Sequence, residues 1–156
     1  MGFFANLFAK KAPKYAQMSK EELLALKDSK FYTAVIATKN TAYQGRFDEL
    51  TDLQKTVFAV HEFDCCAFGD VTLFFTDANS AKLAPYLLNG LQAVGALKTK
   101  AQVEKLVADV DLNGSPVTLN PLAVKAFEED YFTLDENLDK LLPPYVRAHF
   151  DEYYNF

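Results

Sequence analysis

The sequence predicts an all-α fold, a compact single domain of six to eight helices, because three local signals recur along it. A Ser or Thr is followed three residues later by Glu or Gln at 19/22, 51/54 and 99/102, which is the capping box that opens a helix. Apolar residues then return at i, i+3, i+4 and i+7, the period of an amphipathic helix. Glycine or proline stands near the expected helix ends.

The chain is long enough for one helical domain. Its 156 residues are 50% hydrophobic and 24% charged, which supports a packed core and excludes wholesale disorder. We expect a single helical domain over 19–156, preceded by an N-terminal amphipathic segment over 1–18. In that segment four apolar residues at helical spacing precede three lysines. This short pattern favours a helix packed on the domain, or a frayed end, over a membrane anchor.

The first half of the domain is expected to contain three helices. The first capping box opens a helix over 20–38, and the turn at 40–45 follows it. The second box opens a helix that continues to about residue 67, close to Gly69. Asp70 is placed to cap a short apolar helix over 71–76.

The second half begins with Pro85, which is tolerated only in a first helical turn and therefore predicts a helix from about residue 84 to Gly95. The third capping box opens the next helix at Thr99. The turn at 113–116 could join two very short strands, 110–112 and 117–119, in a hairpin. Asn120 and the proline after it open another helix, a leucine stripe over 134–142 ends at two prolines, and a last stripe covers 146–153.

Charge is distributed unevenly along the chain. Residues 1–100 carry 12 basic and 10 acidic groups, whereas residues 101–156 carry 4 and 11. The overall charge of −5 argues against direct binding to nucleic acid, because phosphate repels it. The excess of acidic residues in 101–156 forms either a solvated surface or a surface that presents carboxylates to a basic partner. Its members are Glu128, Glu129, Asp130, Asp135, Glu136, Asp139, Asp151 and Glu152.

The only two cysteines, Cys65 and Cys66, are adjacent, which is not the spacing of a disulfide framework. We expect both to be buried free thiols in a reducing compartment, and therefore a cytoplasmic protein. No apolar run reaches the length of a membrane span, which argues against a membrane role.

No pattern in the chain predicts a catalytic, metal or cofactor site. A Gly-rich phosphate loop is absent from the sequence, and the residues after His61 lack the second histidine of a zinc-protease motif. A cysteine could pair with His149 as a nucleophile, but acidic neighbours would raise the pKa of either thiol. We therefore expect no catalysis, no cofactor and no metal.

Asp64 falls on the apolar side of its helix, at a position where an apolar residue is due. A buried carboxylate is costly unless it is hydrogen-bonded or paired. We expect Asp64 either to accept backbone N–H bonds from the turn at 68–70 or to face a groove.

Several motifs follow one another from residue 50 onward. They are an apolar helix with Asp64 near its end, Gly69-Asp70-Val71, Phe74-Phe75-Thr76-Asp77, a helix that closes in Gly95-Ala96, and a C-terminal Leu141-Leu142 and Tyr145-Val146. With them, about two thirds of the chain resembles a bacterial domain family first described as of unknown function, whose best-described member is a DNA-mimic protein. The family's Asn-Gly-Gly-Phe turn is altered here, because Asp70 and Val71 replace its second Gly and its Phe.

The resemblance implies an all-α fold, self-association as a homodimer, and protein binding rather than catalysis. The residues that would carry the family's turn and helix are Asp64, Gly69, Asp70, Phe74 and Phe75. We favour a non-enzymatic acidic binding protein, a DNA-mimic-like protein whose C-terminal carboxylates engage a basic or DNA-binding protein.

Two alternatives remain open on the sequence alone. The first is an enzyme that uses the neighbourhood of His61, Asp64 and Cys65, which would require a solvent-accessible cleft there. The second is an interaction or immunity-type module that binds through an apolar groove lined by Tyr86 and the two adjacent phenylalanines of the 74–77 motif.

Overall fold

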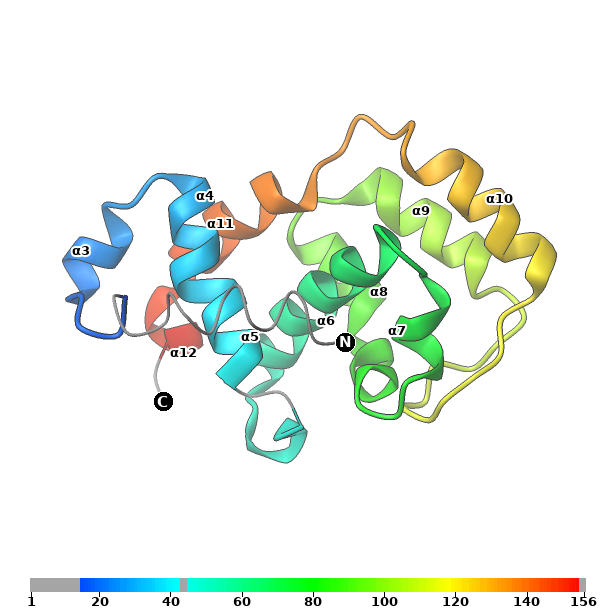
Figure 1. The fold of residues 1–156 in the computed structure, drawn as a ribbon, viewed down its shortest axis with the longest axis horizontal. Helices are drawn as coiled ribbons and strands as arrows, with labels where there is room; N and C mark the ends of the chain where they lie inside the picture. The colour runs from blue at the N-terminus through cyan, green and yellow to red at the C-terminus, as the bar shows by residue number, and fades with distance from the viewer. Residues whose placement is uncertain (1–14, 43–44, 155–156) are drawn as a thin grey trace.

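The computed structural model describes residues 15–42 and 45–154, and every regular element among them is helical (Figure 1). Its longer helices are α6 (Asp52–Ala67), α8 (Ala84–Ala93), α9 (Leu97–Leu106), α10 (Pro121–Tyr131) and α11 (Leu138–Ala148). Shorter helical pieces connect these around one core. The predicted all-α fold is confirmed. Most of the predicted segment 1–18 lies outside the described residues, and no helix within them is long and apolar enough to cross a bilayer.

The central helix of the fold is α6, and its predicted capping box is formed. Thr51 accepts from the Gln54 N–H at 3.2 Å, and the Gln54 side chain accepts from the Thr51 N–H at 2.9 Å. Helix α8 crosses α6 at Gly90, where a Cβ would lie 2.8 Å from Val60 Cγ2 and 3.0 Å from the Thr56 carbonyl oxygen. This close approach therefore depends on a residue without a side chain.

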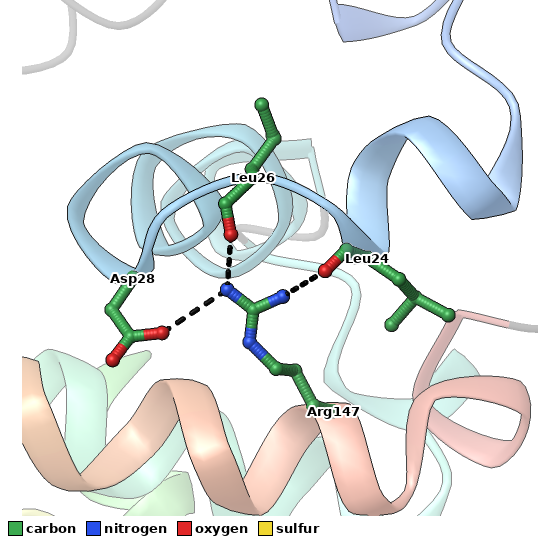
Figure 2. Close-up of polar contacts among 4 residues, drawn as sticks. All are labelled: Leu24, Leu26, Asp28 and Arg147. Atoms are coloured by element: carbon green, nitrogen blue, oxygen red, sulfur yellow. Dashed lines mark hydrogen bonds and ion pairs between the residues drawn. The ribbon is translucent and has the colours of Figure 1, made fainter.

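The single helix predicted over 20–38 is wrong, because the chain breaks after residue 24. The first piece is α3 (Lys20–Leu24); the second runs through α4 (Asp28–Phe31), a π-helical stretch η1 (Tyr32–Ala37) and α5 (Thr38–Ala42). Arg147 lies in the break and donates to the carbonyls of Leu24 and Leu26 at 2.6 and 2.5 Å (Figure 2). These bonds satisfy carbonyls that a helix end leaves without partners.

The elements around α8 match their sequence signals. Asp70 Oδ1 accepts from the Thr72 N–H at 2.9 Å at the start of α7 (Thr72–Thr76), although Val71, not Asp70, is the N-cap residue of this helix. A 3₁₀ turn, η3 (Ser80–Leu83), leads into α8, which begins at the predicted residue with Pro85 in its first turn. Gly95 ends α8 at φ +82°, a conformation that favours glycine.

Helix α9 begins at Leu97, so the capping box predicted at Thr99 is wrong. The carboxylate of Glu136, far along the chain, accepts from the N–H groups of Lys98 and Thr99 at 3.0 and 2.6 Å. A distant side chain thus replaces the local cap, and Thr99 becomes a buried residue inside the helix.

The hairpin considered over 110–119 does not form, since no strand is found there. Instead, the Val117 N–H donates to the Phe75 carbonyl at 2.9 Å and ties this extended segment to α7. The segment ends where Asn120 caps α10 by accepting from the Leu122 N–H at 2.9 Å, as predicted.

Helix α11 continues through Pro143 and Pro144, which were predicted to end it. The carbonyls that lose their intrahelical donors belong to Asp139 and Lys140, two exposed residues. Water can satisfy those oxygens, so the helix tolerates both prolines. The chain breaks instead at His149, and α12 (Phe150–Tyr154) follows.

Candidate partner-binding surface

Three exposed acids, Glu128, Glu129 and Asp130, occupy the last turn of α10. Carboxylates at a helix C-terminus are opposed by the helix dipole, so helix stability does not explain their position. The basic residue on α10 is Lys125, whose ammonium lies 3.9 Å from Glu129; both side chains are exposed. Such an exposed pair contributes little to stability, and one lysine does not neutralise the charge of three carboxylates.

The loop after α10 and the first turn of α11 add three more carboxylates with different surroundings. Asp135 is exposed, and Asp139 lies in the first turn of α11, where its N–H is capped by Asn137 at 3.0 Å. Glu136 is half-buried because it caps α9. Partial burial would raise its pKa, but the N–H groups of Thr99 and Lys98 hold the pKa of Glu136 below its usual value. Glu136 therefore remains charged while it stabilises the fold.

Asp151 and Glu152 lie on α12, at the opposite end of the molecule from α10 (Figure 1). Both are exposed, and Asp151 forms an ion pair with Lys20. The eight acids singled out in the sequence are thus divided between two places: six over 128–139 and two on α12.

Asp64 is buried, with 6% of its surface exposed, and it accepts a hydrogen bond from the Tyr131 hydroxyl at 2.9 Å. The expected backbone bonds from the turn at 68–70 are not made to this carboxylate; the Phe68 N–H donates to the Asp64 backbone carbonyl instead. Burial raises the pKa of Asp64 to about 7, which the Tyr131 bond opposes and nearby Asp139 supports.

A pocket of about 160 Å³ opens beside Asp64, between the end of α6 and the loop that joins α10 to α11. Two phenylalanines border it, Phe68 with 67% and Phe132 with 61% of their surface exposed, and their ring centroids are 5.9 Å apart. Sequence reasoning missed this ring pair. The available signals were an aromatic in a turn beside Gly69 and another directly after an acidic run.

His61 and Cys65, proposed with Asp64 for an enzyme, do not share its pocket. His61 is buried, its Nδ1 lies against the Tyr32 hydroxyl, and its Nε2 is 3.9 Å from Cys65 Sγ. Burial lowers the pKa of His61 to about 4, so the imidazole is neutral. Desolvation, Glu62 and Asp64 raise the pKa of Cys65 to about 12, so the sulfur is a thiol. Neither group is activated for nucleophilic attack.

The cysteines are free, but the prediction that both are buried is wrong. Cys65 is exposed and Cys66 is partly buried. Both lie in the last turn of α6, and Cys65 is on the part of the helix that faces away from the core. Among the described residues, no group of three or more His, Cys, Asp or Glu side chains is arranged to hold a metal ion.

The apolar groove considered around Phe74 and Phe75 is not present, because both rings are fully buried. They pack edge to face on Phe63, and Tyr86 is half-buried against Phe47. The family-motif phenylalanines therefore belong to the core, while Gly69 and Asp70 lie exposed at the start of α7.

A model of the DMP19-like protein family matches residues 48–149. The match covers α6 to α11 and includes the acids of 128–139, whereas Asp151 and Glu152 lie beyond it. Comparisons with curated proteins and with solved structures gave no match. By the match over about two thirds of its length, the chain belongs to the DMP19-like protein family, a family of DNA-mimic-like domains.

Proposed function

We propose that this protein is a non-enzymatic acidic binding protein that occupies the DNA-binding surface of a basic protein. The observation that carries the proposal is the acidic run from 126 to 139, which contains six carboxylates and no basic residue. Three of these carboxylates are exposed at the end of α10, where the helix dipole disfavours them. Membership of a DNA-mimic-like family supports the same function.

The electrostatics of such a surface suit a partner that normally binds phosphates. Lysines and arginines that contact DNA are spaced to neutralise backbone charge, and a row of carboxylates can take the place of that charge. The field of clustered acids also accelerates encounter with a basic protein. Binding of this kind is expected to weaken steeply with salt and to compete with DNA.

Protein binding rather than catalysis is supported by the protonation states beside α6. The thiol of Cys65 stays protonated near neutral pH, and the lowered pKa of His61 makes its imidazole a weak base, so the pair does not supply a thiolate nucleophile. No cofactor enters the proposal.

The proposal places the protein in the cytoplasm as a homodimer. Free cysteines fit a reducing compartment, and the family resemblance underlies the self-association. Sedimentation analysis across protein concentration tests the oligomeric state, and a mass of 17.5 kDa at all concentrations would contradict the dimer.

The experiment begins with capture of basic DNA-binding proteins from the host on the immobilised chain. A purified captured protein is then titrated with the wild type at increasing salt and in the presence of duplex DNA. We compare E128Q/E129Q/D130N with the matched control E21Q/D151N/E152Q, which removes the same charge from α3 and α12 at the other end of the molecule (Figure 1).

We expect the α10 variant to bind about tenfold more weakly, and the control to change binding less than about threefold. Duplex DNA should displace the wild type, and the affinity should fall with each increase in salt. Equal losses in both variants, salt-independent binding, or a ternary complex with DNA would overturn the proposal.

A further inference from the structure

Two exposed aromatic rings meet at the edge of the acidic surface. Phe68 follows α6 and Phe132 follows α10, so residues far apart in the sequence are brought together at 5.9 Å between ring centroids. The core beneath is already filled by Phe63, Phe127 and Tyr131, which pack on one another. The exposed pair therefore adds apolar surface that the fold does not bury.

The pocket beside these rings combines apolar walls with negative charge. Its polar and aromatic lining consists of Asp64, Phe68, Tyr131, Phe132, Glu136 and Asn137. Among the described residues that line it, none is basic. Asp64 is buried there, and a buried carboxylate is costly when it is charged without a cation. Among the described lining residues, no positive group offsets the carboxylates of Asp64 and Glu136.

The size of the pocket limits what can enter it. A volume of about 160 Å³ is below the range of roughly 300–1,000 Å³ that holds small-molecule ligands and cofactors. A single charged side chain fits this space better than a helix or a nucleotide does.

Arginine is the cation that suits this combination of groups. Its planar guanidinium stacks on aromatic faces, pairs with carboxylates through two N–H groups, and is more weakly hydrated than an ammonium. The same chemistry occurs within this molecule: the Arg147 guanidinium lies 4.0 Å from the Phe31 ring centroid and 3.1 Å from Asp28 Oδ1.

We propose that the pocket bordered by Phe68 and Phe132 binds an arginine side chain of the partner, with the guanidinium against these rings and near the Asp64 and Glu136 carboxylates. The inference rests on the proposed function for the identity of the partner as a basic protein. The six carboxylates of 128–139 attract that protein, and the pocket fixes how it docks. In such an interface the arginine is the anchor residue.

The test uses a probe that carries one arginine. The capped peptide Gly-Gly-Arg-Gly-Gly is titrated into the full chain at low salt, and ring and amide signals are followed by NMR. The same peptide with citrulline, the neutral isostere of arginine, and with lysine are the comparison ligands. F132A tests the pocket, and L122A, which truncates a 78% exposed side chain at the other end of α10, is the matched control.

We expect the arginine peptide to shift the signals of Phe68, Tyr131 and Phe132 first, and to bind at least tenfold more tightly than the citrulline peptide. F132A should weaken this binding fivefold or more, while L122A leaves it unchanged. Lysine should bind several-fold more weakly than arginine. Because Phe132 and Leu122 are both largely exposed, both variants should fold.

Three results would overturn the inference: equal binding of citrulline, equal binding of lysine, or shifts spread over α10 that leave the pocket signals in place. In each case the salt-sensitive, DNA-competed binding of a basic protein could still be observed, so the proposed function would stand. If the arginine peptide fills the pocket but the α10 charge variant binds its protein partner normally, the proposed function fails instead.

Discussion

The Arg147 guanidinium donates a hydrogen bond to the backbone carbonyl of Leu24 at 2.6 Å and so joins α11 to the end of α3 (Figure 2). A second N–H group donates to Leu26, and the guanidinium packs over Phe31. One side chain from the last third of the chain therefore stabilises a helix break near the N-terminus. No local feature of residues 20–38 indicates this break.

Replacing Arg147 with Ala is expected to destabilise the fold by about 2–3 kcal/mol, because two backbone carbonyls lose charged donors. Arg147→Lys should retain part of this stability, since one ammonium cannot reproduce the fork of the guanidinium. Urea denaturation followed by circular dichroism measures the unfolding free energy of both variants. D28N, which removes an exposed partner of the same guanidinium, should cost less than about 1 kcal/mol. An R147A protein as stable as the wild type would contradict this role.

The contribution of Asp64 to stability should decrease as pH rises from about 4 to about 7, and it opposes the contribution of His61, whose pKa is lowered from 6.5 to about 4. The pKa of Asp64 is 3.8 in its ordinary state and about 7 when it is buried in the native protein. Between these values the native state binds a proton that the unfolded state has released, so raising the pH favours unfolding. The full effect is at most about 4 kcal/mol.

Asp64→Asn removes this titration while it keeps an acceptor for the Tyr131 hydroxyl. The unfolding free energy of the variant minus that of the wild type should increase with pH from 4 to 7, and the variant should be the more stable protein at pH 8. D135N, at an exposed acid on the same side, is the control and should leave the slope unchanged. Parallel pH curves for D64N and the wild type would show that Asp64 titrates normally.

Gly90→Ala should destabilise the crossing of α6 and α8 by about 1–3 kcal/mol, because the new methyl group would lie 2.8 Å from Val60 Cγ2. Gly69→Ala is a matched control, since its nearest contact would be 3.9 Å away and its φ is not positive. Thermal unfolding compares the two. Recovery of stability in G90A/V60A relative to G90A would identify the clash as the cause, and a stabilised G90A would disprove it.

Glu136→Ala should cost about 1 kcal/mol, because the first N–H groups of α9 lose their acceptor. Glu136→Gln keeps an acceptor oxygen but loses the charge, so it should cost less. Hydrogen exchange at Lys98 and Thr99 locates the effect: their amides should exchange faster in E136A than in E136Q. Unchanged protection of these two amides would mean that water replaces the carboxylate without loss.

Local sequence patterns are sufficient to place the start of most helices and to identify the acidic residues of one surface. The capping boxes at Thr51 and Ser19, the proline in the first turn of α8 and the cap at Asn120 act within four residues, so they can be recognised without knowing the fold. The acids of 128–139 are likewise adjacent in the chain, and most of them remain exposed.

The features that depend on distant partners become visible only in the folded molecule. Arg147 and Leu24 are 123 residues apart, Tyr131 and Asp64 are 67 apart, and Glu136 lies 37 residues after the Thr99 N–H that it accepts from. The ring pair and pocket beside Asp64 also arise from packing between α6 and the end of α10. A hydrogen bond or a ring contact is made in space, and a local sequence pattern carries no information on which distant group will supply it.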